Sequence, residues 1–560
     1  MRFGTSFFNG AVLKKDITRF APAWSLYAVG MALVLLPALY QNAGSVYSLG
    51  NHLIYSAAVN CLYALVCALL LFGDLFNPRL CYALHAMPMR REGWFATHTA
   101  AGMLFSLVPN LLLAVLCMPA LEQYAWAGLI WLLGMQMQYL FFFALALFCV
   151  MCSGNRLAMA LVYGILNFLA LILYFFATIL YLPELYGIRI SWEPFFLFSP
   201  VLHLMAGSFR PFSFLRDTTR DGAFVSGGWL YMVVLAGIGL VLLGASLVLY
   251  RRRKLESAGD FLAFRPVAPV FRIVYTLCVG MLFRGFLDLF FGSGTLSTLF
   301  LVMGILVGYF TAQMLLGRTV KVFRLRNLAG CAVILCVLAL SVWLTRLDPL
   351  NITGYVPEPE EVEQVTFSGE YAGVDYRGAY ITADPADIAC LTEIHSAYLA
   401  GPNKAVFSPF SIRYTLRGGR TVTRYYYYAP DAETAGLVAG YLSRPEYVLG
   451  YVDWEYYVNS VGLITDSDLE LRLSDPEKIR GLLDAVKADC LAGRITRPWD
   501  YYSSSEATVS DKNFAVTWLD LSFLRDPGGD QDTSETILIC RDCTETIDWL
   551  TENGYPLPEE

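Results

Sequence analysis

Nine apolar runs, each about as long as a membrane-spanning helix, are the feature that most constrains how this chain folds. A bilayer core requires roughly 20 predominantly apolar residues for one helical crossing. Because lipid offers no hydrogen-bond partners to the backbone, runs of this length are expected to be helices. We expect spans at residues about 22–40, 52–73, 100–118, 125–152, 157–182, 228–250, 273–291, 296–316 and 328–345.

Charge divides the chain near residues 345–361. Up to Arg346 the chain carries 24 Lys and Arg against 11 Asp and Glu, whereas the remainder carries 16 against 36. The net charge therefore changes from +13 to −20, which indicates two regions in two environments. We predict a polytopic α-helical membrane protein with a soluble, acidic α+β domain at 347–560. The negative charge of that domain argues against nucleic acid as a partner, because phosphate repels it.

The membrane region divides into three parts. We expect an interfacial amphipathic helix at 1–21, a six-span core at 22–250 with a long outer loop at 183–227, and three further spans at 251–346. For the first part, an ordinary basic flank is the alternative. A signal peptide cleaved after "PALYQNA" is the alternative for the first span, but eight further apolar runs follow, so we treat that span as retained.

Orientation is predicted from the basic residues of the loops, because Lys and Arg stay on the cytoplasmic side. With the N-terminus inside, the inner segments hold 18 Lys and Arg and the outer loops hold four. The four outer ones, Arg189, Arg210, Arg216 and Arg220, all lie in the one long loop. Nine spans then place the acidic domain outside the membrane.

The acidic domain contains a possible internal repeat. "DPADIACLTEIHSAYLAG" from Asp384 resembles "DPEKIRGLLDAVKADCLAG" from Asp475 in outline. Each copy begins with an Asp cap and a Pro at the first helical position, and each ends at a glycine. We therefore expect two similar lobes, about 360–445 and 446–556, each with a helix, paired strands and a second helix. The apolar faces of the two first helices are predicted at Ile388, Leu391 and Ile394, and at Ile479, Leu482 and Val486.

Strands and further helices of the two lobes follow from their own patterns. Residues 411–428 predict a hairpin that turns at Gly418-Gly419, and residues 431–442 predict the helix after it. In the second lobe, strands are expected in 514–524 and 535–542, and a helix in 544–554.

Catalytic and metal-binding motifs are missing from the sequence. No G-x-x-x-x-G-K-[ST] phosphate loop, H-E-x-x-H or G-x-S-x-G occurs, and the five histidines show no ligand spacing. We expect a chain that is not an enzyme and holds no cofactor. Thirteen cysteines form no disulfide framework, and the spacing of Cys540 and Cys543 leaves a small disulfide, a redox role or chance open.

Two charged or aromatic groups of the membrane region are candidate sites. Arg284 and Asp288 stand four residues apart in the seventh span, and we expect an intramembrane ion pair. The outer loop is apolar but interrupted by prolines, which predicts a re-entrant or interfacial hairpin over the fifth and sixth spans. Four of its residues are candidates for a substrate exit, with lipid contact as the alternative: Phe195, Phe196, Phe198 and His203.

Several stretches carry a family resemblance by their order along the chain. They are "FFNGAVLKKDITRFAPAW", "LFGDLFNPRLCYALHAMPMRREGWFATHTAAGMLF", "GYFTAQMLLGRTVKVF", "DPADIACLTEIHSAYLAG" and "SIRYTLRGGRTVTRYYYY". In these the chain resembles bacterial ABC transporter permeases of the type-2 exporter class, in the subgroup that ends in an uncharacterised extra domain. Met87 and Met89 depart from the branched aliphatic residues usual in that family.

The resemblance implies a function, partners and a location. In such exporters a short cytoplasmic segment between the second and third spans contacts the ATPase subunit. Here it implies an ATPase-coupling segment within residues 81–97, with a plain topology signal as the alternative. ATP and Mg would bind the separate ATPase, and a second permease chain, identical or different, would complete the pore in a bacterial cytoplasmic membrane. The coupling residues would be His85, Met87, Pro88, Arg90, Arg91 and Glu92.

Two functions therefore compete. The first is the permease subunit of an ATP-driven exporter that moves a hydrophobic or cationic substrate outward. The second is a membrane-anchored extracytoplasmic sensor or binding protein without transport activity.

Overall fold

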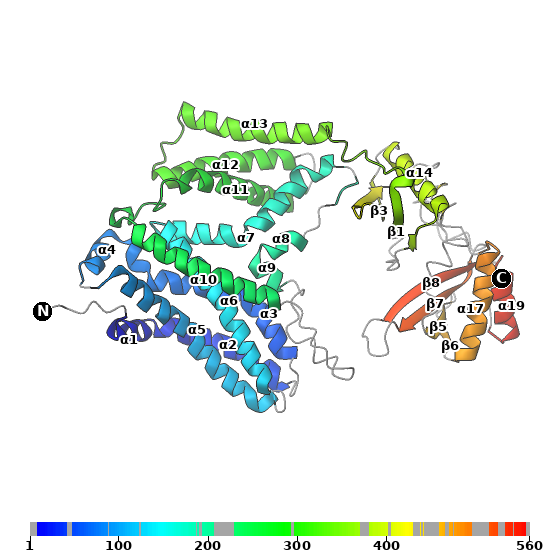
Figure 1. Ribbon diagram of the computed structural model, residues 1–560, viewed down its shortest axis with the longest axis horizontal. Helices are drawn as coiled ribbons and strands as arrows, with labels where there is room; N and C mark the ends of the chain where they lie inside the picture. The colour runs from blue at the N-terminus through cyan, green and yellow to red at the C-terminus, as the bar shows by residue number, and fades with distance from the viewer. Residues whose placement is uncertain are drawn as a thin grey trace. The chain divides into compact units, whose positions relative to one another are not determined.

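The computed structural model consists of two units (Figure 1). Unit 1 comprises Met1–Tyr181 and Ser191–Trp343, and unit 2 comprises Leu182–Ile190 and Leu344–Glu560. The residues that the structure describes are 8–41, 47–87, 89–121, 125–185, 187–189, 193–205, 229–292, 296–369, 380–400, 405–428, 437, 441, 458–464, 470–473, 475–494, 515–524, 532–540 and 542–555.

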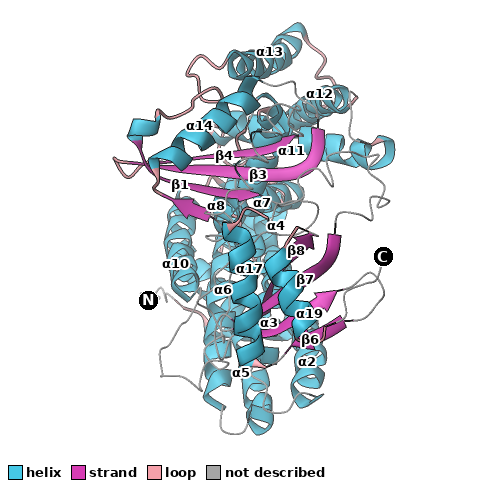
Figure 2. Ribbon diagram, turned by 90° about the vertical axis from the view of Figure 1, so that its right-hand side faces the viewer, coloured by secondary structure: helices cyan, strands magenta, loops and turns pink. Residues whose placement is uncertain are grey.

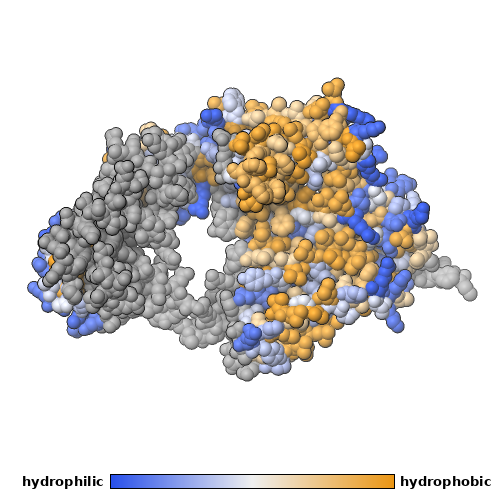
Figure 3. Space-filling view, turned by 180° about the vertical axis from the view of Figure 1, so that it is seen from behind, coloured by the Kyte–Doolittle hydropathy of each residue, from blue (hydrophilic) through white to orange (hydrophobic). Residues whose placement is uncertain are grey.

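Within the described part of unit 1, nine helices are long and apolar enough to cross a membrane, as the sequence predicted. Their apolar surfaces form a wide band in a space-filling view (Figure 3), which is the surface that lipid would cover. The nine are α2 (Ala21–Gln41), α3 (Tyr47–Leu71), α5 (Arg91–Leu121), α6 (Ala125–Cys152), α7 (Arg156–Leu180), α10 (Trp229–Arg252), α11 (Val267–Phe291), α12 (Ser297–Gly317) and α13 (Leu325–Leu347).

The predicted start of the third span, at residue 100, is wrong. Helix α5 begins at Arg91, nine residues earlier, and its first turns bury Trp94, Phe95 and His98 inside the protein. The prediction rested on an unbroken apolar run, which Arg91 and Glu92 do not continue. The helix nevertheless includes them, because no glycine pair or proline interrupts it there. The connection between α4 (Pro78–His85) and α5 is therefore short.

The N-terminal segment forms α1 (Gly10–Arg19), and α1 packs on α5. Asn9 caps α1 with its side-chain oxygen, which accepts hydrogen bonds from the amides of Ala11 and Val12. Leu13, Ile17 and Phe20 pack against the main hydrophobic core, so the apolar stripe of α1 faces protein.

Helix α6 lies at the centre of the core, where it packs against α3, α5 and α10 (Figure 1). Its side chains Trp131, Tyr139 and Phe142 are fully buried. Because α6 is covered by protein over most of its length, it holds the other helices of the core together.

Helices α11 and α12 form a hairpin that packs through small residues. A Cβ atom at Gly304 would lie 2.8 Å from the carbonyl oxygen of Gly280, and one at Gly308 would lie 2.9 Å from that of Thr276. Residues 304–308 form a G-x-x-x-G sequence, the pattern that lets two membrane helices approach closely. The hairpin therefore depends on backbone contact at these two glycines.

We expect Gly304→Leu to separate α11 from α12, because the new side chain would overlap the Gly280 backbone. Overpacking of this kind costs about 1–3 kcal/mol, so the purified protein should unfold at a lower temperature. Gly285→Leu is the matched control, because a side chain at Gly285 of α11 meets open space. Equal unfolding temperatures for the two variants would contradict this packing.

Unit 2 contains two four-stranded antiparallel sheets with the same strand order (Figure 2). The sequence predicted one strand pair in each lobe, and the structure adds a second pair to each, which precedes the helix. The first sheet runs β2-β1-β3-β4 and the second β6-β5-β7-β8. The strands are β1 (Val362–Gly369), β2 (Tyr380–Thr382), β3 (Ala405–Leu416), β4 (Thr421–Tyr428), β5 (Val458–Ile464), β6 (Glu470–Leu473), β7 (Ala515–Leu524) and β8 (Asp532–Cys540).

The first helices of the two lobes take the same place in each topology. Helix α14 (Pro385–Ala400) lies in the chain between β2 and β3, and α17 (Pro476–Leu491) between β6 and β7. Asp384 and Asp475 each accept a hydrogen bond from the amide two residues on, at 3.2 and 3.1 Å. The six predicted core residues of these helices are buried. Within the described residues, the two lobes therefore share one β-β-α-β-β order.

The remaining lobe predictions have mixed outcomes. The hairpin of β3 and β4 turns at Gly419, whose φ of 74° favours glycine, and α19 (Thr544–Glu552) matches the predicted last helix. Most of the helix predicted at 431–442 lies outside the described residues.

The core of the first lobe buries a histidine on α14. His395 is fully buried, and its Nδ1 lies 3.1 Å from the Tyr414 hydroxyl oxygen. Burial, together with the nearby Arg424 guanidinium, lowers the pKa of His395 from 6.5 to about 4. The folded lobe therefore holds this ring in its neutral form at neutral pH.

We expect the first lobe to lose stability as the pH falls from 6.5 to 4. The unfolded chain binds a proton on His395 in this window and the folded lobe does not, so acid favours unfolding by up to about 3 kcal/mol. Hydrogen exchange of β3 and β4 peptides at a series of pH values measures this loss. His395→Gln should remove most of the dependence, and identical pH profiles for the two proteins would contradict the assignment.

Candidate functional site

The candidate coupling segment is a helical corner. Helix α4 (Pro78–His85) begins at Asn77, whose side-chain oxygen accepts a hydrogen bond from the Arg79 amide at 3.0 Å. Pro78 occupies the first turn, where its missing N–H costs nothing. Only residues 86–90 connect α4 to α5. The predicted surface segment at 81–97 is therefore two helix ends joined by a short connection.

Arg91 and Glu92 make contacts within the protein, and the partner contact expected of them stays a prediction. The Arg91 Nη1 atom donates to the carbonyl oxygens of Tyr250, Arg251 and Arg253, at 3.5, 3.3 and 3.0 Å. Glu92 Oε1 lies 2.9 Å from Arg251 Nε. The last carbonyls of a helix are unpaired and carry partial negative charge, so a guanidinium placed there stabilises the end of α10.

Arg253 makes a second link of the same kind. Its side chain is buried, Nη1 donates to the Val150 carbonyl oxygen at 2.7 Å, and Nη2 donates to that of Leu75 at 3.2 Å. Burial lowers the pKa of this guanidinium, but its donors are matched by carbonyls at the end of α6 and in the turn after α3. The sequence pattern offered Arg253 only as one of several loop cations.

His85 joins α4 to the end of α10. Its Nδ1 lies 2.7 Å from the Cys81 carbonyl oxygen, which only an N–H can approach as a donor. Its Nε2, 3.2 Å from the Tyr250 hydroxyl oxygen, is then the acceptor from that hydroxyl. Burial lowers the pKa of His85, which agrees with a neutral ring of this tautomer.

A polar pair holds α1 to α5 beside the corner. Asp16 and His98 are both buried, and Asp16 Oδ2 lies 2.7 Å from His98 Nδ1. The Asn9 amide donates to Thr97 Oγ1 at 3.2 Å, and the Asn9 side-chain amide reaches the Met89 sulfur at 3.4 Å. The corner is therefore supported from the N-terminal side as well.

The outer surface of the corner is mixed apolar and basic. Leu80, Tyr82 and Met87 are each about half exposed, with exposed Arg79 and Arg90 beside them in sequence. Pro88 lies outside the described residues. Of the six predicted coupling residues, Met87 and Arg90 thus lie on the surface, whereas His85, Arg91 and Glu92 hold the corner to α10. The sequence analysis did not single out Leu80 and Tyr82. The available signal was their position on a short helix, α4, between residues that favour helix ends.

The same end of unit 1 collects four inter-helix connections. Gly154, between α6 and α7, exchanges backbone hydrogen bonds with residues 259–261 after α10. Arg318 at the end of α12 donates to Asp260 Oδ1 at 2.7 Å and to the Gly259 carbonyl. We call this the basic end; hydrophilic side chains line it at the right edge of Figure 3. Its exposed cations are Lys14, Lys15, Arg19, Arg79, Arg90, Arg156, Arg251, Arg252, Lys254, Arg265, Arg318, Lys321, Arg324 and Arg326.

Arg284 and Asp288 form the ion pair that their spacing predicted. Arg284 Nε lies 3.2 Å from Asp288 Oδ2, and both side chains are mostly buried. Ser297 at the start of α12 donates to Asp288 Oδ1 at 2.6 Å. The pair therefore ties the two ends of the α11–α12 turn together, which is a structural role.

The described part of the outer loop contains two short helices, α8 (Glu193–Leu197), which carries Phe195 and Phe196, and α9 (Pro200–Met205), which carries His203. Phe198 lies between them. Between the two short helices, Ser199 Oγ accepts a hydrogen bond from the Leu171 amide at 3.3 Å. Leu171 lies roughly 14 Å before the end of α7, at 1.5 Å per residue. These two short helices therefore contact α7 well within its length, and a re-entrant or interfacial placement stays a prediction. Phe195 packs near Tyr174, Phe198 is largely exposed, and the His203 ring lies 4.2 Å from Tyr231. A substrate exit at Phe195, Phe196, Phe198 and His203 stays a prediction.

A buried polar network, which the sequence analysis missed, joins four spans. Asn60 donates to Gln138 at 3.1 Å, and the Tyr27 hydroxyl donates to Asn60 at 2.9 Å. Asn110 donates to Ser106 at 3.1 Å, and all of these side chains are buried. Amide side chains inside apolar runs were the available signal, because such groups need partners in a membrane.

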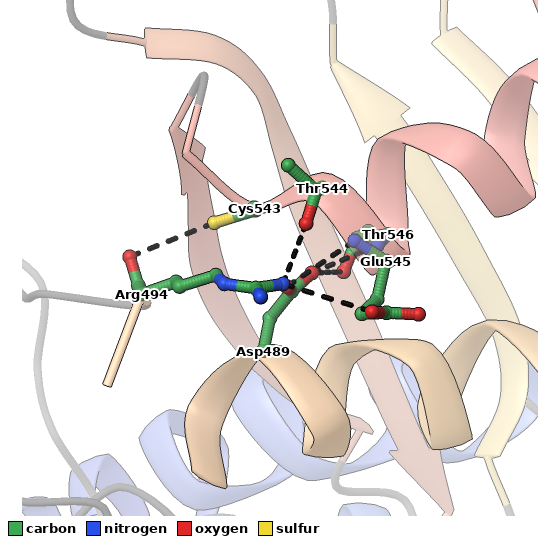
Figure 4. A network of polar contacts seen from close by, with 6 residues as sticks. All are labelled: Asp489, Arg494, Cys543, Thr544, Glu545 and Thr546. Atoms are coloured by element: carbon green, nitrogen blue, oxygen red, sulfur yellow. Dashed lines mark hydrogen bonds and ion pairs between the residues drawn. The ribbon is translucent and has the colours of Figure 1, made fainter. Parts of the chain in front are cut away.

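In the second lobe, a buried carboxylate connects α17 to α19 (Figure 4). Asp489 is fully buried and accepts hydrogen bonds from the amide and hydroxyl of Thr546, at 2.8 and 2.6 Å. Arg494 donates to the same carboxylate at 3.0 Å. Asp489 thereby caps the start of α19. Cys543 is buried beside this network, and the side chain of Cys540 lies outside the described residues.

In the first lobe, strand β4 holds both segments that enter unit 2 from unit 1. The Tyr425 amide donates to the Gly187 carbonyl oxygen at 2.9 Å, and the Arg189 guanidinium lies over the Tyr425 ring. Arg424 is buried on the other face of β4 and donates to the Ile352 carbonyl oxygen at 2.6 Å. The continuations of α7 and α13 are therefore attached to neighbouring residues of one strand.

Comparisons with protein-family models, curated proteins and solved structures found no match for the chain. The resemblance to exporter permeases therefore stays a prediction from the sequence motifs. Within the described residues, no group of three or more His, Cys, Asp and Glu side chains could hold a metal ion.

We expect Arg253→Met to destabilise the six-span core by roughly 3 kcal/mol, because carbonyls buried without a donor cost 1–3 kcal/mol each. Thermal unfolding of the purified protein measures this. Arg252→Met is the matched control, since Arg252 is the exposed neighbour on the same helix end. Unfolding temperatures that agree between the two variants would show that Arg253 does not hold α6 to α10.

Proposed function

We propose that this chain is the membrane subunit of an ABC exporter and that a separate ATPase subunit docks on the outer surface of the α4–α5 corner. The chain forms the multi-pass membrane part and contributes no phosphate-binding loop of its own. ATP and Mg belong to the partner, and a second permease chain completes the pathway for a hydrophobic or cationic substrate.

The connection between the corner and the spans is the observation that carries the proposal. Arg91, Glu92 and His85 attach the corner to the end of α10, and Arg253 attaches the end of α10 to α6. A displacement imposed on α4 therefore reaches α5, α6 and α10 through direct hydrogen bonds. Motion of packed helices around bistable contacts is a known route for such coupling.

The exposed face of α4 supplies the proposed docking surface. Tyr82 and Met87 expose about half of their surface beside Arg90. An aromatic side chain that a partner buries, with cations around it, is typical of the centre of a protein–protein interface. We base the orientation on the excess of Lys and Arg at the basic end. Because such residues stay on the cytoplasmic side, the proposed orientation has the basic end in the bacterial cytoplasm and unit 2 outside.

A test of the proposal changes only this face. The chain is co-purified with the ATPase that a neighbouring gene encodes, as wild type and as Tyr82→Ala with Met87→Ala. We expect the double variant to bind the ATPase at least about tenfold more weakly, because two central interface residues contribute over 1 kcal/mol each. Substitution of Arg91 is avoided, because its loss would uncap α10.

The control variant combines Leu157→Ala with Val270→Ala, two exposed apolar residues near the starts of α7 and α11, outside α4. It should bind the ATPase as the wild type does. Equal binding of the ATPase by both double variants would show that the ATPase does not dock on α4.

The alternative function is a membrane-anchored extracytoplasmic sensor, and the two attachments on β4 favour it. Through Gly187 and Ile352, the first lobe is joined to segments that continue α7 and α13. A sensor of this kind needs no ATPase, so the absence of any ATPase in complexes recovered from native membranes would support it over the exporter.

A further inference from the structure

The connection between α12 and α13 alternates cations with exposed apolar side chains. Lys321, Arg324 and Arg326 are exposed. Between and beside them, Val320, Phe323 and Leu325 expose 74%, 67% and 85% of their surface. No acidic residue occurs in the sequence between Asp288 and Asp348. This pattern differs from an ordinary polar loop, because large apolar side chains are presented together with the charges.

The backbone of this connection is fixed to the protein. Val322 is buried, and its carbonyl oxygen accepts hydrogen bonds from the Arg324 amide at 2.8 Å and the Asn327 side chain at 2.7 Å. Arg318 is anchored on Asp260. Arg318 and the buried Val322 hold the segment in place, and the Phe323 ring packs on Phe310 of α12, with the ring centroids 4.8 Å apart. The exposed cations and apolar side chains are thereby held in a defined arrangement.

Helix α13, which follows, has few protein contacts. Only Cys331 among its residues is buried, whereas Val333, Val337, Leu340 and Leu344 are exposed. Its contacts include a small cluster around Ile305, a hydrogen bond of 2.9 Å between Ser341 and Tyr181, and Arg346 Nε at 3.8 Å from Glu184 Oε2. Most of the apolar surface of α13 is therefore exposed, as expected of a helix that faces lipid.

We propose that Lys321, Arg324 and Arg326 bind the headgroup phosphates of anionic phospholipids. Val320, Phe323 and Leu325 insert at the boundary between headgroups and acyl chains. Clusters of Lys and Arg next to a membrane helix attract anionic lipids by about 1 kcal/mol for each cation, and neighbouring apolar side chains add burial in the interface. The occupied site holds the first turn of α13 at the membrane surface.

Lipid binding by the purified full-length chain in detergent tests this site. Fluorescent phosphatidylglycerol is titrated against the wild type and against the triple variant Lys321→Gln, Arg324→Gln and Arg326→Gln. We expect the triple variant to bind it roughly 100-fold more weakly, from about fivefold for each cation. Phosphatidylcholine should bind both proteins alike.

The matched control removes three other exposed cations of the basic end: Arg79→Gln, Arg156→Gln and Arg265→Gln. It should keep the wild-type affinity for phosphatidylglycerol. An equal loss in both triple variants would overturn the proposal in favour of a diffuse charge effect. Competition by soluble glycerol phosphate at equal concentration would also overturn it, because the site would then bind free phosphate.

A charge-conserving variant covers the case in which the triple variant fails to fold. Lys321→Arg, Arg324→Lys and Arg326→Lys should keep the affinity for phosphatidylglycerol within about threefold, since each position keeps its cation. Weak binding of phosphatidylglycerol by this variant, as a folded protein, would overturn the proposal, because every position still carries its cation.

Discussion

The buried guanidinium of Arg253 is the interaction on which the six-span core depends. A helix that ends inside a protein leaves carbonyl oxygens without donors, and α6 ends in this way at Val150 and Met151. Arg253 supplies the donors, and Arg91 supplies them in turn to the end of α10, including the carbonyl of Arg253. Two arginines from distant parts of the sequence therefore join α5, α10 and α6 at one end. The proposed coupling segment is a part of this joint and presents only its outer face to solvent.

Away from the joint, the helices are held in different ways. Hydrogen bonds among Tyr27, Asn60, Asn110 and Gln138 join α2, α3, α5 and α6, where an unpaired amide would be costly in lipid. Helices α11 and α12 approach closely at Gly304 and Gly308, and a hydrogen bond from Ser297 to Asp288 joins them at their turn. Helix α13 has few hydrogen bonds and little close packing of these kinds, and in our proposal the membrane surface holds its first turn.

Unit 2 repeats one topology and uses its two copies differently. In the first copy, β4 attaches the chain segments that continue α7 and α13. In the second copy, Asp489 binds α17 to α19. The first lobe is thus the one that binds the chain segments continuing from the membrane helices α7 and α13.

The sequence by itself determined the number of spans, the acidic α+β domain and its repeat. These follow from local patterns: apolar runs of span length, and an Asp-Pro cap followed by apolar residues at helical spacing. Sequence spacing also found Arg284 and Asp288, because residues four apart on a helix are neighbours. The tertiary structure alone decided which arginines face inward. Arg90 and Arg91 are neighbours of the same residue type, yet Arg90 is exposed, whereas Arg91 donates to carbonyl oxygens at the end of α10, 159 residues away or more. Contacts between distant segments, at α10, at β4 and in the polar network, depend on how helices pack, and no local pattern records that.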